Sequence, residues 1–161
     1  MPTYFTKQGL DNYKEYLEGL ENRLKELQLQ VGVVTEGTNT WHDNAGYDHL
    51  VMDIRVADIR LNEAMAPIRN IELVTYPSSV DHVMIGSEVA FSIDGQVNTY
   101  EIVGYGEDDF DKFRILYNAP IIQKLMGHKK GDKYEAEFMG EKQEIEVLDV
   151  KPLSWVVNQQ E

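Results

Sequence analysis

The chain has 161 residues, 42% of them apolar, and carries 15 Lys and Arg against 28 Asp and Glu, a formal net charge of −13. This length and apolar content suffice for one ordinary domain or two small ones. The charge argues against independent nucleic-acid binding, because a phosphate backbone attracts clustered Lys and Arg, and it favours a protein partner or a basic cavity. Because there is no cysteine, disulfides and thiolate zinc sites are excluded.

No apolar run approaches the roughly 18 residues of a membrane-spanning helix. The N-terminal stretch "MPTYFTKQGL" lacks the basic and apolar regions of a signal peptide. We therefore expect a cytoplasmic protein with no membrane partner.

Apolar residues in the N-terminal part recur in alternating steps of three and four, the heptad spacing of a coiled-coil seam. Their positions are Leu10, Tyr13, Leu17, Leu20, Leu24, Leu27, Val31 and Val34. Gly32 and Gly37 weaken the pattern at its far end, because glycine is a poor helix former. The spacing predicts a helix from about residue 8 to about residue 35.

A second seam with the same steps follows, and it predicts a second helix that ends near residue 70, with Pro67 close to its last turn. Its positions are Tyr47, Leu50, Ile54, Ala57, Leu61, Ala64 and Ile68. Two heptad helices joined by a short linker run antiparallel and bury their seams against each other. Residues 1–76 are thus predicted to form an N-terminal antiparallel coiled-coil hairpin.

Beyond the linker "VTYPSSVDH" the pattern changes to segments of period two, rich in β-branched and aromatic residues, which predict strands. These segments are "EVAFSI", "VNTYEIVGY", "FRILY", "KYEAEF" and "QEIEVLDV". The segment "APIIQKLMGHKKGD" predicts one short helix that ends at Gly127. We expect an α+β fold, with an antiparallel sheet and one short helix over residues 80–156.

The segment between the two predicted helices, "EGTNTWHDNAGYDHL" at residues 36–50, contains Glu36, Asp43 and Asp48. These carboxylates could share a hard cation such as Mg²⁺. Alternatively, Asp43 or the next residue caps the second helix by accepting its free N–H groups. A zinc site built from two histidines of this segment and Asp53 is a further alternative, since His49 and Asp53 share a helix face.

Two other segments, and the motifs that are absent, give no support for a metal site or an enzyme. The acidic segment "GEDDFDK" lacks the ligand spacing of a calcium-binding loop, and we interpret it as a solvated loop. The segment "NAPII", residues 118–122, is either a helix start or a docking point. The sequence contains no Gly-rich phosphate loop, catalytic triad order or nucleophile elbow, so nothing supports an autonomous hydrolase or nucleotide enzyme.

The order of these parts resembles the bacterial Gre transcript-cleavage factors, the GreA/GreB family of transcription elongation factors. The N-terminal "YFTKQGLDNYKEYLEGL" looks like the start of the family, and "DNAGYDHL" is similar to its Glu-Asn-Ala-Glu-Tyr signature, with Asn44, Ala45 and Tyr47 in matching places. The segments "IGSEVAF", "YEIVG", "APIIQKLMGHKKGD" and "EIEVLDV" follow the family's C-terminal FKBP-like domain in order. The resemblance covers the chain to about residue 152.

The resemblance implies that the C-terminal domain docks on the rim of the secondary channel of RNA polymerase while the hairpin tip enters the channel. There two tip acids of the family help to hold the second catalytic Mg²⁺, so that water attacks a backtracked transcript. The factor would have no cofactor of its own and would not be an enzyme, since it stimulates the polymerase's intrinsic RNA cleavage. It would meet the nascent RNA 3′ end only within the polymerase.

Residue by residue, the resemblance places Asp43 at the second tip acid, where it would face the Mg²⁺, and Thr40 at the first, so that one acid is missing. Trp41 and His42 stand where the family has smaller or aliphatic groups, and Glu36 is a candidate substitute acid. The family's docking motif, an Asp or Asn followed by Ser and Pro, corresponds to a short segment in which alanine replaces the serine. That segment is Asn118, Ala119, Pro120 and Ile121.

Three functions remain open from the sequence. The first is an elongation factor that promotes cleavage of backtracked transcripts, with Asp43 as the main metal-facing carboxylate. The second is a non-cleaving regulator that enters the secondary channel, because Thr40 replaces an acid. The third, a prolyl isomerase or chaperone, is suggested only by the FKBP-like domain, and fold alone does not determine function.

Overall fold

The computed structural model describes residues 1–36 and 45–158, except for the side chains of residues 33–36 and 157–158. The chain divides into two compact units, Met1–Thr3 with Asp11–Ile71 and Tyr4–Leu10 with Glu72–Glu161. In the described residues, no helix is long and apolar enough to cross a membrane.

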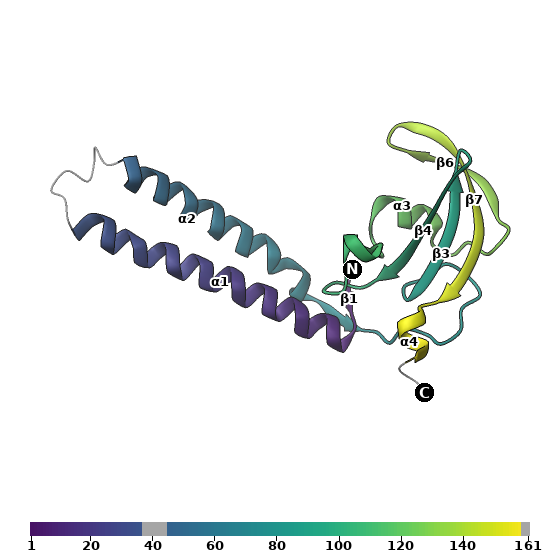
Figure 1. Cartoon of the computed structure of the whole chain (residues 1–161), viewed down its shortest axis with the longest axis horizontal. Coiled ribbons are helices and arrows are strands. Elements are labelled where there is room, and N and C mark those ends of the chain that lie inside the picture. The colour runs from purple at the N-terminus through teal and green to yellow at the C-terminus, as the bar shows by residue number, and fades with distance from the viewer. Residues whose placement is uncertain (37–44, 159–161) are drawn as a thin grey trace. The chain divides into compact units, whose positions relative to one another are not determined.

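Two long helices lie side by side in the first unit, α1 (Lys7–Glu36) from Asp11 onward and α2 (Ala45–Ala64) (Figure 1). The predicted seams are confirmed, because every seam residue whose side chain is described is buried or half-buried. Leu17, Leu27 and Leu50 are the most deeply buried of them. The hydroxyl of Tyr13 donates to the backbone carbonyl of Ala64 at 2.6 Å, which ties the start of one helix to the end of the other.

The second helix ends at Ala64, earlier than the sequence predicts, and a 3₁₀ turn, η2 (Ala66–Arg69), replaces its last turn. Pro67 lies at the start of this turn. Proline has no N–H to continue the α-helical ladder, and its ring clashes with the preceding turn, so the helix tightens and stops there. The short strands β1 (Thr3–Phe5) and β2 (Ile71–Leu73) form a two-stranded sheet that the sequence analysis does not predict.

The second unit contains a five-stranded sheet in the order β5-β4-β3-β7-β6 (Figure 1). Its strands confirm the five predicted segments: β3 (Ser87–Ile93), β4 (Gln96–Val103), β5 (Arg114–Leu116), β6 (Lys133–Phe138) and β7 (Glu141–Pro152). The pairs β3–β4, β3–β7 and β6–β7 are antiparallel as expected. However, β5 runs parallel to β4, so the sheet is mixed. The connection between these two strands contains a turn of 3₁₀ helix, η3 (Phe110–Lys112), and returns the chain to the same end of the sheet.

A short helix, α3 (Pro120–Leu125), covers one face of the sheet, as the sequence predicts. Its Ile122 and Leu125 are fully buried in a core formed with side chains from three strands. Those side chains are Val89, Phe91, Ile102, Ile145 and Val147. A second, smaller cluster joins Tyr76, Val103 and Leu153, next to the C-terminal helix α4 (Ser154–Asn158).

Candidate functional site

The segment that joins α1 and α2 lies outside the described residues, and with it most of the predicted tip. The positions concerned are Thr40, Trp41, His42, Asp43 and Asn44. Glu36 is the last residue of α1, and its side chain is not described either. The roles of these residues in cleavage, metal binding or obstruction stay predictions.

The structure does describe the residues that follow the predicted tip, from Ala45 onward. Ala45 begins α2 and is exposed, while Tyr47 is half-buried, as its place in the seam requires. Asp48 lies in the first turn of α2, where a carboxylate interacts favourably with the helix dipole. Across residues 1–36 and 45–158, no three His, Asp or Glu side chains converge on a point that could hold a metal ion. Magnesium binding by Asp43, and a zinc site that includes His42, rest on the undescribed segment.

The predicted docking segment forms the entry to α3. Ala119 is the N-cap residue, with an extended backbone and no side-chain cap, and Pro120 occupies the first turn. Asn118 and Pro120 are exposed, whereas Ala119 and Ile121 pack in part against the core. The side-chain amide of Asn118 donates to the hydroxyl of Tyr105 at 3.1 Å, which orients it on the surface. Thus only two of the four predicted docking residues are exposed.

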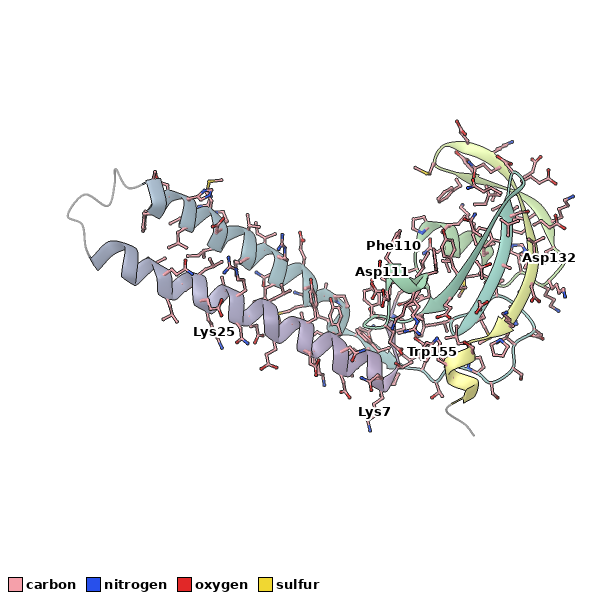
Figure 2. The ribbon with its side chains drawn as sticks, viewed as in Figure 1. Lys7, Lys25, Phe110, Asp111, Asp132 and Trp155 are labelled. Carbon is pink, nitrogen blue, oxygen red and sulfur yellow. The ribbon has the colours of Figure 1, made fainter. Side chains whose placement is uncertain are left out.

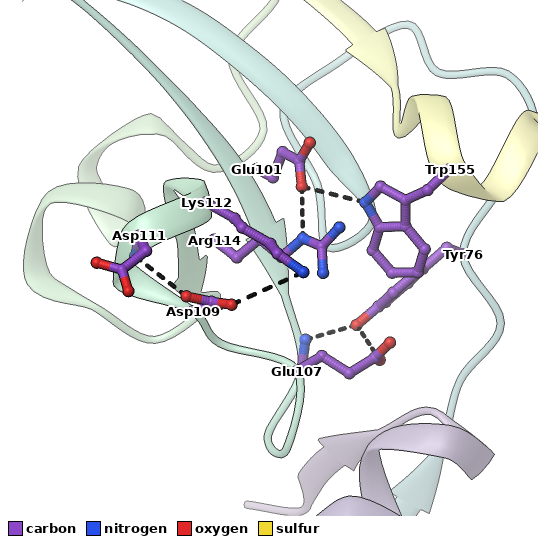
Figure 3. Close-up of polar contacts among 9 residues, drawn as sticks. Tyr76, Glu101, Glu107, Asp109, Asp111, Lys112, Arg114 and Trp155 are labelled. Carbon is purple, nitrogen blue, oxygen red and sulfur yellow. Dashed lines mark hydrogen bonds and ion pairs between the residues drawn. The ribbon is translucent and has the colours of Figure 1, made fainter.

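A buried tyrosine organises polar contacts in the same unit. The hydroxyl of Tyr76 donates to the Glu107 carboxylate at 2.7 Å and accepts from the Gly104 N–H at 2.7 Å (Figure 3). The hydroxyl of Thr6 also donates to Glu107 and accepts from the N–H of Gly9 at 2.9 Å. Burial raises the pKa of Tyr76 well above its ordinary value, and the adjacent Glu107 carboxylate raises it further. The phenol therefore stays protonated and holds the loop at Gly104 in place.

A second polar cluster lies on the sheet beside it (Figure 3). The guanidinium of Arg114 donates to the Glu101 carboxylate at 2.9 Å, and the indole N–H of Trp155 donates to the same oxygen at 3.1 Å. Arg114 also lies over the Trp155 ring, 4.6 Å from its centroid, which is a cation–π contact. These contacts fasten α4 to strands β4 and β5.

Sequence reasoning missed both clusters. Glu107 belongs to the acidic segment interpreted as solvated loop, and Tyr76 belongs to the predicted linker. Their partners are far along the chain, since 101 residues separate Thr6 from Glu107 and 31 residues separate Tyr76 from Glu107. No local pattern marks such contacts. Their chemistry is structural, because each acid is already engaged by several donors.

The family model and the curated relatives that match this chain all point to one family. Residues 77–152 match the family model described as Transcription elongation factor, GreA/GreB, C-terminal. Transcription elongation factor GreA of Thermomicrobium roseum is 30% identical over 130 residues, which cover 79% of this chain and 83% of that protein. GreA of Clostridium perfringens is 30% identical over 153 residues, which cover 92% of this chain and 94% of that protein.

Among solved structures, GreA factor homolog 1 (Gfh1) of Thermus thermophilus is 19% identical, with a TM-score of 0.45, and the match covers 93% of this chain and 99% of that chain. The GreA/GreB structure from Nitrosomonas europaea is 16% identical, with a TM-score of 0.35, over 93% of this chain and 98% of that chain. On the sequence identity to the curated relatives and the matching C-terminal model, this chain belongs to the GreA/GreB family of transcription elongation factors.

Proposed function

We propose that this protein binds RNA polymerase, inserts the tip of its hairpin in the secondary channel and promotes cleavage of the backtracked transcript, which releases arrested complexes. The hairpin is the observation that carries the proposal. Its helices have 30 and 20 residues, which correspond to roughly 45 Å and 30 Å at 1.5 Å per residue. The seams of the two helices pack against each other, and residues 37–44 connect these helices in the sequence.

The chemistry belongs mostly to the polymerase. In the proposed complex the polymerase holds its catalytic Mg²⁺ ions, and the Asp43 carboxylate adds negative charge close to the second one. Such a charge raises the occupancy of the metal and helps to orient the attacking water. Thr40 offers a hydroxyl where a second carboxylate is expected, so the cleavage it supports is weaker than that of a tip with two acids.

Docking is assigned to the entry of α3. Asn118 and Pro120 are exposed there on a rigid base, since Ile122 and Leu125 of the same helix are buried in the core. The net charge of −13 favours a basic surface as the partner and steers its approach. Nucleic acid would be met only through the polymerase.

The test uses a polymerase stalled in a backtracked state with Mg²⁺ and follows release of the RNA 3′ fragment. Wild type is expected to accelerate release, Asp43→Ala to abolish the acceleration, and Thr40→Asp to increase it. Asp48→Ala is the matched control, because Asp48 is an exposed acid a few residues away in the first turn of α2. Equal cleavage by wild type and Asp43→Ala would contradict the role of Asp43.

A non-cleaving regulator of the secondary channel is the second candidate, favoured by the Thr at position 40 and the bulky Trp41 and His42. Under this alternative, wild type binds the polymerase without cleavage, and Thr40→Asp creates the activity. An absence of polymerase binding would contradict both candidates.

A further inference from the structure

Half of strand β4 has an open edge. The strand pairs with β3 over Gln96–Glu101, but the short strand β5 covers only Glu101–Val103 on its other side. Among the described residues, no strand pairs with the outer side of the remaining part, Gln96–Tyr100. The edge is therefore a row of main-chain groups available to another strand.

Alternation along the strand identifies these groups. The N–H of Glu101 donates outward to Phe113 at 2.9 Å, whereas the carbonyl of Ile102 points to the other side and accepts from Gly86. In an antiparallel pair the outward-facing residues alternate with the paired ones. Val97 and Thr99, in step with Glu101, consequently direct their N–H and C=O groups to the open edge.

A groove of about 420 Å³ follows this edge. It is lined by Glu88, Val97, Asn98, Thr99, Tyr100, Glu101, Lys112 and Phe113. Three large apolar side chains in this part of the unit are exposed, Val97 by 62%, Phe113 by 61% and Phe110 by 89%. Phe113 has a left-handed backbone (φ 56°), which an L side chain rarely adopts, and its ring lies 6.4 Å from the ring of Tyr100. The groove thus combines main-chain donors and acceptors with apolar walls.

The net negative charge of this unit favours a basic partner segment at the open edge of β4. Residues 77–161 carry eight Lys and Arg against sixteen Asp and Glu, a balance of −8. Within the groove Glu88 is paired with Lys151 and Glu101 with Arg114, so the negative charge that a partner meets is that of the unit as a whole. Asp111, in η3, adds to it next to the exposed Phe110 (Figures 2 and 3). A second copy of this chain would bring the same negative charge to the edge, so self-association is disfavoured. An extended segment with apolar and basic residues in alternation fits the edge, the apolar walls and the charge together.

We propose that the open edge of β4 binds an extended, basic segment of RNA polymerase by strand addition. This inference rests on the proposed function, because it names the polymerase as the partner. The open edge and the docking residues belong to the same unit, and β5 connects them, since Phe113 precedes this strand beside Glu101 and Asn118 follows it. The main-chain groups of Val97 and Thr99 pair with the added strand, and one of its apolar side chains rests against Phe113.

Hydrogen–deuterium exchange of single amides in the free and polymerase-bound full-length protein tests the pairing. The amides of Val97 and Thr99 are expected to exchange at least about tenfold more slowly in the complex. The amide of Asn98 is the internal control. Asn98 pairs with Phe91 of β3, so this amide is expected to be protected from exchange with and without polymerase. Unchanged exchange at Val97 and Thr99 in a complex that forms would overturn the strand addition and leave the proposed function standing. Concentration-dependent protection without polymerase would overturn it in favour of self-association.

Two substitutions test the same edge by affinity. Thr99→Pro removes one outward N–H from an edge position that tolerates proline, and it is expected to weaken polymerase binding about tenfold. Thr99→Val keeps the main chain and is expected to bind as wild type does. Phe113→Gly removes the apolar wall at a position where glycine relieves the left-handed strain, so weaker binding with an unchanged melting temperature is expected. Wild-type affinity in both Thr99→Pro and Phe113→Gly would overturn the inference, and no binding by wild type would overturn the proposed function with it.

Discussion

Within the second unit, the first turn of α1 lies so close to the backbone of Tyr105 that only glycine fits at position 9. A Cβ atom at Gly9 would lie 2.5 Å from the backbone oxygen of Tyr105, 3.2 Å from the Thr6 hydroxyl oxygen and 3.3 Å from Cγ of Glu107. By contrast, a Cβ atom at Gly19, ten residues further along the same helix, would meet nothing within 4 Å. The two glycines therefore make a matched pair for alanine substitution.

The expected effects have opposite signs. Alanine is favoured over glycine inside a helix by up to about 1 kcal/mol, so Gly19→Ala should raise the free energy of unfolding by that amount. At Gly9 the same gain is outweighed. The contact with the Tyr105 oxygen is about 0.9 Å shorter than ordinary van der Waals contact at 3.4 Å, and relieving such overpacking by a backbone shift costs roughly 1–3 kcal/mol. The shift also disturbs the contact between Thr6 and Glu107, so we expect a net loss of about 2 kcal/mol.

Urea unfolding followed by circular dichroism at 222 nm measures both variants against wild type. Fluorescence of Trp155, in a Trp41→Phe background, reports the C-terminal unit separately, because its indole is held by Glu101 within that unit. Separate reporting matters because two units need not unfold together. A rise in the unfolding midpoint of Gly9→Ala equal to that of Gly19→Ala would refute the steric reasoning.

Three further changes test other parts of the structure. Ala119→Ser should stabilise the protein by roughly 0.5–1 kcal/mol in urea unfolding, because it gives α3 the N-cap hydroxyl that the helix lacks. Tyr76→Phe should cost roughly 1–3 kcal/mol in the same assay, since the buried Gly104 N–H loses its acceptor, and a cost below about 0.5 kcal/mol would contradict this. A hydrogen bond from the Lys129 N–H lowers the pKa of Asp132, so its stabilisation is present above about pH 4 and is lost as the pH falls through the folded-state value. Asp132→Asn should therefore flatten the fall of the melting temperature below pH 4, and an unchanged slope would refute the assignment.

Local periodicity was sufficient to predict most elements. The seams of α1 and α2 follow from steps of three and four along the chain, and the described seam side chains are buried or half-buried as expected. The strands were predicted in the same way, since alternation over a few residues reports which face is buried. The sequence predicts the end of α2 too late in the chain. Pro67 has no N–H to continue the α-helical ladder, so the α-helix ends at Ala64, before the proline.

The sequence pattern does not predict pairings between segments that are far apart in the chain. The parallel pair β4–β5 depends on how the connection through η3 returns, and the contact of Tyr76 with Glu107 closes a large loop. The close approach of Gly9 to Tyr105 has the same character. Such contacts are selected by the whole packed unit, and no periodic pattern in one segment encodes them.

The candidate docking surface shows most clearly what the sequence determines and what only the tertiary structure determines. The sequence by itself determined the family resemblance and the segment Asn118–Ile121, because both lie in short runs of residue types. Only the tertiary structure decided that Asn118 and Pro120 face outward while Ile121 packs in part against the core, and that β4 keeps an open edge. Exposure depends on which surfaces the rest of the unit covers, and that is set by packing between segments far apart in the chain.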